Sequence, residues 1–181
     1  MPHNKRLQLT VMDKVPTRIG QRAAGALGPH FGGTVLPPDL EISCEPSRID
    51  VTLVHDFLRT SYWAEGRSRE IVERSIRNSL CFAAYSGGRQ VAFARVITDR
   101  AVFAYLADVF VVPEFRRRGV SKALLRAVLA HPDLQTLRTF SLGTRDAHSL
   151  YAQFGFEPIR EPERLMAKIR QVTRAAKAGQ P

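Results

Sequence analysis

The chain has 181 residues, of which 44% are hydrophobic and 24% charged, and its formal net charge is +10. This length and balance are typical of one globular domain, and no run approaches the roughly 18 apolar residues of a membrane span. The two cysteines and five histidines lack metal-ligand or disulfide spacing, so neither kind of site is predicted. Because the N-terminus lacks the apolar core of a secretory signal, we expect a cytoplasmic protein.

Most of the positive charge lies at the two ends of the sequence. Residues 1–40 contribute +3 and residues 165–181 contribute +4, which leaves only +3 for the stretch between them. Basic ends of this kind raise weak, salt-sensitive affinity for polyanions. They do not predict a nucleic-acid-binding fold.

In chain order, the first segment predicts little regular structure. Residues 1–39 contain many glycines and prolines, and we expect a flexible basic N-terminal extension. One folded domain is expected over residues 40–169 and a basic tail over residues 170–181. The domain begins with a short strand at Leu40–Ser43.

Two amphipathic helices are expected next. Asp50 is suited to cap a helix that ends at Leu58, because the apolar residues after it share one helical face. Ser68 is suited to cap a second helix, with Val72 and Ile76 on its inner face.

Three strands then follow in succession. LCFAAYS (80–86) and QVAFARVIT (90–98) flank Gly87-Gly88, a dipeptide that favours a tight hairpin turn. The apolar run VFAYLADVFVV (102–112) predicts a central strand, which Pro113 ends.

The last third of the chain completes the pattern. It predicts a helix over 120–130, a strand over 139–144, a short helix capped by Asp146, and a closing antiparallel pair from FGFEPI (154–159) and LMAKI (165–169). The order β-α-α-β-β-β-α-β-α-β-β predicts an α+β (mixed α/β) domain with helices flanking one sheet.

The segment FRRRGVSKALL (115–125) places three arginines and a glycine between a buried strand and a helix. The first turn of a helix offers unpaired N–H groups and a positive dipole end, which suit phosphate. Gly119 permits close backbone approach, and arginines add bidentate contacts. An arginine cluster before a helix is often only a solvated patch, but this strand-loop-helix context favours an anion cradle. No ATP, NAD or serine-hydrolase motif is present.

Two stretches, YLADVFVVPEFRRRGVSKALL (105–125) and AHSLYAQFGFEP (147–158), resemble the hallmark motifs of the GNAT superfamily of acyl-CoA-dependent N-acetyltransferases. In that family the loop reads Gln/Arg-x-x-Gly-x-Gly/Ala. The three defined positions of this pattern are occupied here by Arg116, Gly119 and Ser121, and the serine departs from the family's glycine or alanine. The resemblance implies a central, mostly antiparallel sheet that splays open between its fourth and fifth strands. It also implies acetyl-CoA as co-substrate and no metal.

The resemblance further implies which residues hold the co-substrate. Backbone groups of Val109, Phe110 and Val111 would pair with the pantetheine amides. Thr144 stands where many relatives have an asparagine that contacts the cofactor arm. The pyrophosphate would lie on the loop and the helix start, formed by Arg116, Arg117, Arg118, Gly119, Val120, Ser121 and Lys122.

By the same resemblance, an amine attacks the thioester directly, and Tyr151 stands where the family places the proton donor for the leaving thiolate. The alternative for Tyr151 is a half-buried helix tyrosine. Asp108 is the only charged residue in an apolar run. Three roles stay open for it: deprotonating the amine through water, binding a cationic acceptor, or anchoring a loop. Many relatives carry Glu-Asp here, whereas this chain has Ala107-Asp108.

Tyr62 and Trp63, between the first two helices, and Tyr105 on the central strand are expected to shape the acceptor pocket, although packing explains the first two equally well. The expected function is N-acetylation of a small-molecule amine or a protein amino group, with no membrane partner and a homodimer left open. One alternative is a non-catalytic acetyl-CoA-binding sensor of the same fold. A basic nucleic-acid-binding module is less favoured, because no zinc spacing or recognition-helix signature occurs.

Overall fold

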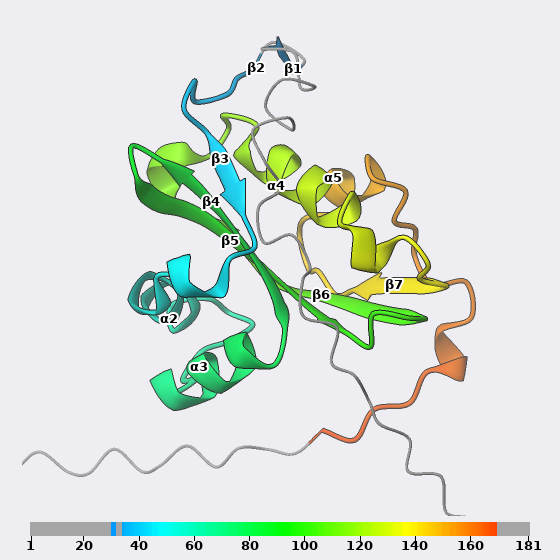
Figure 1. The fold of residues 1–181 in the computed structure, drawn as a ribbon. Helices are drawn as coiled ribbons and strands as arrows, with labels where there is room; N and C mark the ends of the chain where they lie inside the picture. The colour runs from blue at the N-terminus through cyan, green and yellow to red at the C-terminus, as the bar shows by residue number, and fades with distance from the viewer. Residues whose placement is uncertain (1–29, 32–33, 170–181) are drawn as a thin grey trace, which may run out of the picture.

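The computed structural model describes residues 30–31 and 34–169 (Figure 1). The expected N-terminal extension therefore lies mostly outside the described residues, and the expected C-terminal tail lies wholly outside them. Before the main sheet, strands β1 (His30–Phe31) and β2 (Thr34–Val35) form a small antiparallel ladder. The sequence pattern did not indicate this ladder.

One five-stranded sheet organises the domain, in the order β3-β4-β5-β6-β7. Neighbouring strands are antiparallel, except that β6 and β7 are parallel. The predicted fold class is confirmed. The strands are β3 (Glu41–Ser43), β4 (Leu80–Ser86), β5 (Arg89–Thr98), β6 (Phe103–Val111) and β7 (Thr139–Leu142).

Helices cover both faces of the sheet (Figure 1). Phe93 and Phe110 belong to the hydrophobic cluster under the first helix pair, and Phe82 and Leu124 to the cluster on the other face. The first pair is α2 (Val51–Leu58) and α3 (Arg69–Arg77), and the second is α4 (Val120–Leu129) and α5 (His148–Ala152). Short 3-10 turns are η1 (Pro46–Arg48), η2 (Pro113–Phe115), η3 (Pro132–Leu134) and η4 (Pro162–Arg164). No helix in these ranges is long and apolar enough to cross a membrane.

Two of the three expected helix caps are present. Asp50 Oδ1 accepts a hydrogen bond from the Leu53 N–H at 2.9 Å, and Ser68 Oγ accepts one from the Ile71 N–H at 3.4 Å. The prediction that Asp146 caps a helix is wrong. α5 begins only at His148, and the hydroxyl of Thr144 accepts from the Ala147 N–H at 3.0 Å instead.

Replacing Asp50 with alanine is expected to destabilise the protein by about 1 kcal/mol, because the Leu53 N–H loses its acceptor. Urea denaturation measures the loss. Asp50→Asn keeps an acceptor oxygen and serves as the control. Equal loss of stability in both variants would contradict the assigned cap.

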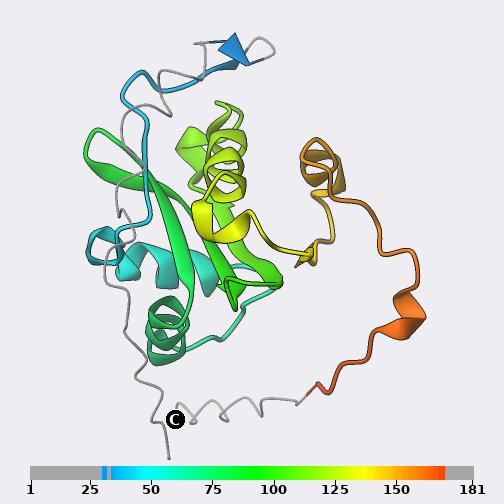
Figure 2. The ribbon, with the colours of Figure 1, turned by 45° about the vertical axis from the view of Figure 1, so that its right-hand side comes forward.

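The predicted closing strand pair does not form. Figure 2 shows the segment after α5 running along the outside of the molecule, and residues 156–169 contain η4 but no strand. Pro158 lies within the first predicted strand and disfavours it, because proline lacks the N–H that a strand ladder needs and restricts the residue before it. Four large apolar side chains of this segment are exposed: Ile159, Leu165, Met166 and Ile169.

β6 and β7 separate after a short stretch of pairing. Their register joins Phe103–Leu106 to Thr139–Leu142, whereas β6 continues to Val111. The β5–β6 register shifts at Phe93/Arg95, opposite Asp108, whose φ is 52°. Aspartate tolerates this left-handed conformation better than most residues, and a bulge of this kind bends its strand. The predicted opening between the fourth and fifth strands of the main sheet is therefore present.

Candidate functional site

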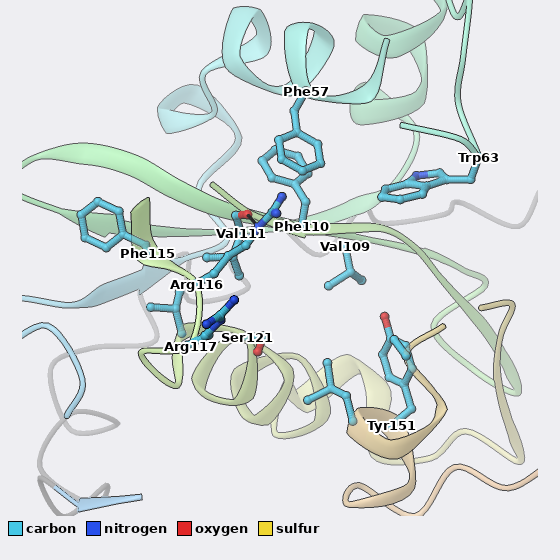
Figure 3. Close-up of a pocket in the computed structure, with 13 residues that line it drawn as sticks. Phe57, Trp63, Val109, Phe110, Val111, Phe115, Arg116, Arg117, Ser121 and Tyr151 are labelled. Carbon is cyan, nitrogen blue, oxygen red and sulfur yellow. Dashed lines mark hydrogen bonds between the residues drawn. The ribbon is translucent and has the colours of Figure 1, made fainter. Parts of the chain in front are cut away.

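A cavity of about 390 Å³ lies where β6 and β7 separate (Figure 3). Residues 109–111 of β6 form one wall, and Leu150 and Tyr151 of α5 stand across from them. Phe57 of α2 and Trp63 of the following loop complete the upper side in Figure 3. The loop before α4, the first turn of α4 and the residue before α5 supply the remaining lining: Phe115, Arg116, Arg117, Val120, Ser121 and Ala147.

Gly119 shapes the end of this cavity. It is the N-cap of α4, with φ 74° and ψ −1°, and no side chain bonds the N–H groups of the first turn. Because Val120 and Ser121 line the cavity, the positive end of the α4 dipole borders it. Arg116 Nε donates to the Val111 carbonyl at 3.1 Å and so ties the loop to the end of β6. These features can hold an anion with backbone hydrogen bonds.

The Tyr151 hydroxyl points into the cavity toward Val109 (Figure 3). Burial raises the pKa of Tyr151 above its usual value, and the nearby Tyr62 and Asp146 act in the same direction. The phenol therefore stays protonated, and can donate a proton, at neutral and mildly alkaline pH.

Asp108 lies between two guanidinium groups. Its side chain is only 4% exposed and accepts from Arg95 Nε at 2.7 Å and from Arg67 Nη1 at 3.0 and 3.1 Å. Arg95 also donates to Ser79 Oγ at 3.2 Å. The carboxylate thus joins the loop between α2 and α3 to the sheet, and this three-residue ion cluster has an excess of one positive charge.

Tyr62, which does not itself line the cavity, connects two loops beside Trp63. Its ring packs edge-on against Trp63 with centroids 5.0 Å apart, and the Arg145 guanidinium lies 3.8 Å from its centroid. The Arg145 N–H also donates to the Tyr62 hydroxyl at 3.3 Å. The loop after α2 therefore contacts the loop after β7.

Tyr105 and Thr144 lie outside the cavity lining. Tyr105 is partly exposed, and its hydroxyl lies so close to Gly143 that a Cβ there would meet it at 2.9 Å. Thr144 is engaged at the start of α5, where its hydroxyl bonds the Ala147 N–H. Contact of either residue with a substrate stays a prediction.

The cavity brings together most of the residues that the motifs single out. The lining includes Trp63, residues 109–111, Tyr151 and part of the loop before α4. Three other predicted residues of that loop and of the first turn of α4 do not line the cavity: Arg118, Gly119 and Lys122. Sequence reasoning missed four apolar lining residues: Phe57, Phe115, Ala147 and Leu150. Within the described ranges, no three His, Cys, Asp or Glu side chains gather as a metal cluster.

Phe57 shows why these residues were missed. Helical spacing placed it on the apolar face of its helix, and its ring does stack on Phe110 at 3.9 Å. Only the opening of the sheet turns part of this core face into a cavity wall. The arginine partners of Asp108 were also missed, since a buried acid demands a partner but does not specify which arginine.

Comparison with known proteins gives consistent matches. A family model described as "Acetyltransferase (GNAT) domain" matches residues 77–158. The crystal structure of a GNAT-family protein from Xanthomonas campestris pv. campestris is 51% identical, with a TM-score of 0.73, over 76% of this chain and 98% of that one. The protein named "Putative acetyltransferase FG08082" from Gibberella zeae is 25% identical over 147 residues, 68% of this chain and 82% of that protein.

A more distant structure shares the fold. It is a "predicted acetyltransferase with acetyl-CoA" from Clostridium acetobutylicum, 12% identical with a TM-score of 0.54, over 72% of this chain and 96% of that one.

Proposed function

The chain belongs to the GNAT family of acetyltransferases, and we propose that it transfers the acetyl group of acetyl-CoA directly to a primary amine of a small molecule or a protein. The opening between β6 and β7 is the observation that carries this proposal. It leaves a cavity with strand backbone on one side, a tyrosine hydroxyl on the other, and an uncapped helix start at one end. These are the three groups that a diphosphate-bearing thioester needs.

The co-substrate arm lies along β6. Beyond Leu106, this strand has no partner on the β7 side within the described residues. The Val112 N–H donates to the Val91 carbonyl of β5 at 2.9 Å. Because successive N–H groups of a strand point to opposite edges, the Val111 N–H points toward the gap. The pantetheine amides pair with this edge as an added strand would, and the diphosphate lies on the first turn of α4.

In the reaction, the amine nitrogen bonds to the thioester carbonyl carbon and the C–S bond breaks. The proton that the amine loses passes to solvent water and replaces the one that Tyr151 gives to the leaving thiolate. The Val111 N–H stabilises the developing oxyanion. The Tyr151 hydroxyl donates its proton to the leaving thiolate, whose pKa resembles the ~8.5 of cysteine. The raised pKa of Tyr151 keeps this donor protonated.

Asp108 supports the reaction by anchoring the loop that carries Trp63. Both of its oxygens are engaged by guanidinium groups, which leaves the carboxylate poorly suited to accept a proton or to bind a cationic acceptor. Among the three roles considered for Asp108, we therefore propose anchoring.

Calorimetry with acetyl-CoA and a thiol-release assay over a panel of amines test the function together. Micromolar binding with turnover supports the proposal. Binding without turnover on any amine would favour a sensor, and salt-sensitive DNA binding without acetyl-CoA binding would favour the nucleic-acid alternative.

Replacing Gly119 with alanine is expected to weaken acetyl-CoA binding about tenfold. An alanine at φ 74° costs about 1–2 kcal/mol, and relief of this strain moves the N–H groups of the α4 start. Calorimetry measures the affinity. Gly88→Ala is the matched control, because Gly88 has φ 72° in a hairpin turn with open space around it. Equal affinity in both variants would contradict the assigned diphosphate site.

A further inference from the structure

A second cavity, of about 510 Å³, lies at the opposite edge of the sheet. β3 pairs with β4 only through Ala83–Tyr85, so Leu80–Phe82 of β4 have no outer strand partner within the described residues. The cavity fills this place, with residues of α3 on one side and of η3 on the other. Its volume lies in the range of roughly 300–1,000 Å³ that small-molecule sites occupy.

The larger part of the lining of this cavity is uncharged. Both cysteines lie there as buried thiols outside any disulfide, and burial raises the pKa of Cys81 to about 12. His131 is 1% exposed, its Nδ1 accepts from the Asp133 N–H at 3.2 Å, and burial lowers its pKa. It is therefore neutral at pH 7. The aliphatic lining comes from Ile49, Val51, Ile76 and Leu80.

Among the charged residues that line the cavity, one arginine has no acidic partner. Arg69 Nε pairs with Glu73 at 2.9 Å, and Arg100 Nη1 pairs with Asp133 at 3.0 Å. Arg77, in the last turn of α3, also lines the cavity and has no acidic partner among the described residues. The cavity thus combines a largely uncharged lining, part of it aliphatic, with a single uncompensated guanidinium.

We propose that this cavity binds a small amphipathic monocarboxylate, with an unbranched aliphatic body against the apolar lining and its carboxylate on Arg77. One negative charge on the ligand matches the one unpaired cation, Arg77. A second negative charge on the ligand would be repelled by the acidic lining residues Glu73 and Asp133. An amine-ended ligand of the same length would place its charge beside Arg77 and is disfavoured. The site is separate from the opening between β6 and β7, and the inference does not depend on acyl transfer.

Calorimetry of the full chain with octanoate, octanol and octylamine tests the charge preference. We expect octanoate to bind at least about tenfold more tightly than the other two, and Arg77→Gln to remove that advantage, because a charged hydrogen bond is lost. Arg74→Gln is the control, since Arg74 is an exposed residue of the same helix that does not line the cavity. Equal affinities for the three ligands, unchanged octanoate affinity in Arg77→Gln, or no saturable binding would overturn the proposal.

Methyl NMR of the octanoate complex tests the location. Perturbed methyl signals of Ile49, Val51, Ile76 and Leu80 are expected. An aliphatic acid could instead enter the first cavity, and perturbation confined to Val109, Val111 and Leu150 would show that and overturn the assignment.

Discussion

The Tyr151→Phe variant is expected to lose about a hundredfold in kcat, the lower end of what a positioned general acid contributes. The substitution removes one hydroxyl that points into the cavity and keeps the ring that packs in the core (Figure 3). The leaving thiolate must then depart unprotonated or take its proton from water. Acetyl-CoA affinity is expected to stay within about twofold, because in the proposed mechanism the hydroxyl acts at the sulfur and contributes little to binding. Stopped-flow thiol release and calorimetry measure the two quantities separately.

The pH dependence sharpens this test. Since burial raises the pKa of Tyr151, the acid form persists above the usual range, and no loss of kcat from tyrosine ionisation is expected below about pH 10. Tyr85→Phe is the matched control, because the Tyr85 hydroxyl donates to the Arg48 carbonyl at 2.8 Å, far from the cavity. Full kcat in Tyr151→Phe at every pH would rule out Tyr151 as the acid.

The Asp108→Asn variant is expected to lose about 3 kcal/mol of unfolding free energy, since removing one partner of a buried ion cluster leaves the others uncompensated. The asparagine NH₂ would also face a guanidinium. A loss of this size lowers the melting temperature on the order of 10 °C. Calorimetric unfolding measures it. Asp56→Asn is the control, because Asp56 is an exposed acid whose pairing with Arg59 is worth less than about 1 kcal/mol.

Kinetics of the same variant separate anchoring from base catalysis. Well below its melting temperature, Asp108→Asn is expected to keep kcat within about tenfold of the wild type and to keep the shape of its pH profile. Loss of a general base costs about 10²–10⁴-fold and removes the acidic limb of that profile. Such a loss in the folded variant would restore Asp108 as the base.

The sequence predicts most of the fold, because the information it uses is local. Apolar spacing marks the helices and strands of the sheet, Asp50 and Ser68 mark two helix starts, and Gly87-Gly88 marks a hairpin. Each of these features depends on a residue and its near neighbours along the chain. The same local information places the arginine loop between a strand and a helix.

Local pattern is a poor guide after α5. Alternating apolar residues there suggested two closing strands, yet the segment 156–169 contains no strand, and Ile159, Leu165, Met166 and Ile169 are exposed. A strand needs a partner as well as a pattern, and the partner lies elsewhere in the chain.

For the site, the amino-acid sequence by itself determined which residues have the chemistry: a tyrosine on a short helix, a glycine at a helix start and a lone acid in an apolar strand. Only the tertiary structure decided what each can do. The left-handed backbone at Asp108 and the early end of β6–β7 pairing open the cavity, and distant Arg67 and Arg95 surround that acid. The cause is physical: spacing along a chain sets periodicity, whereas charge pairing, burial and empty space depend on residues that only folding brings together.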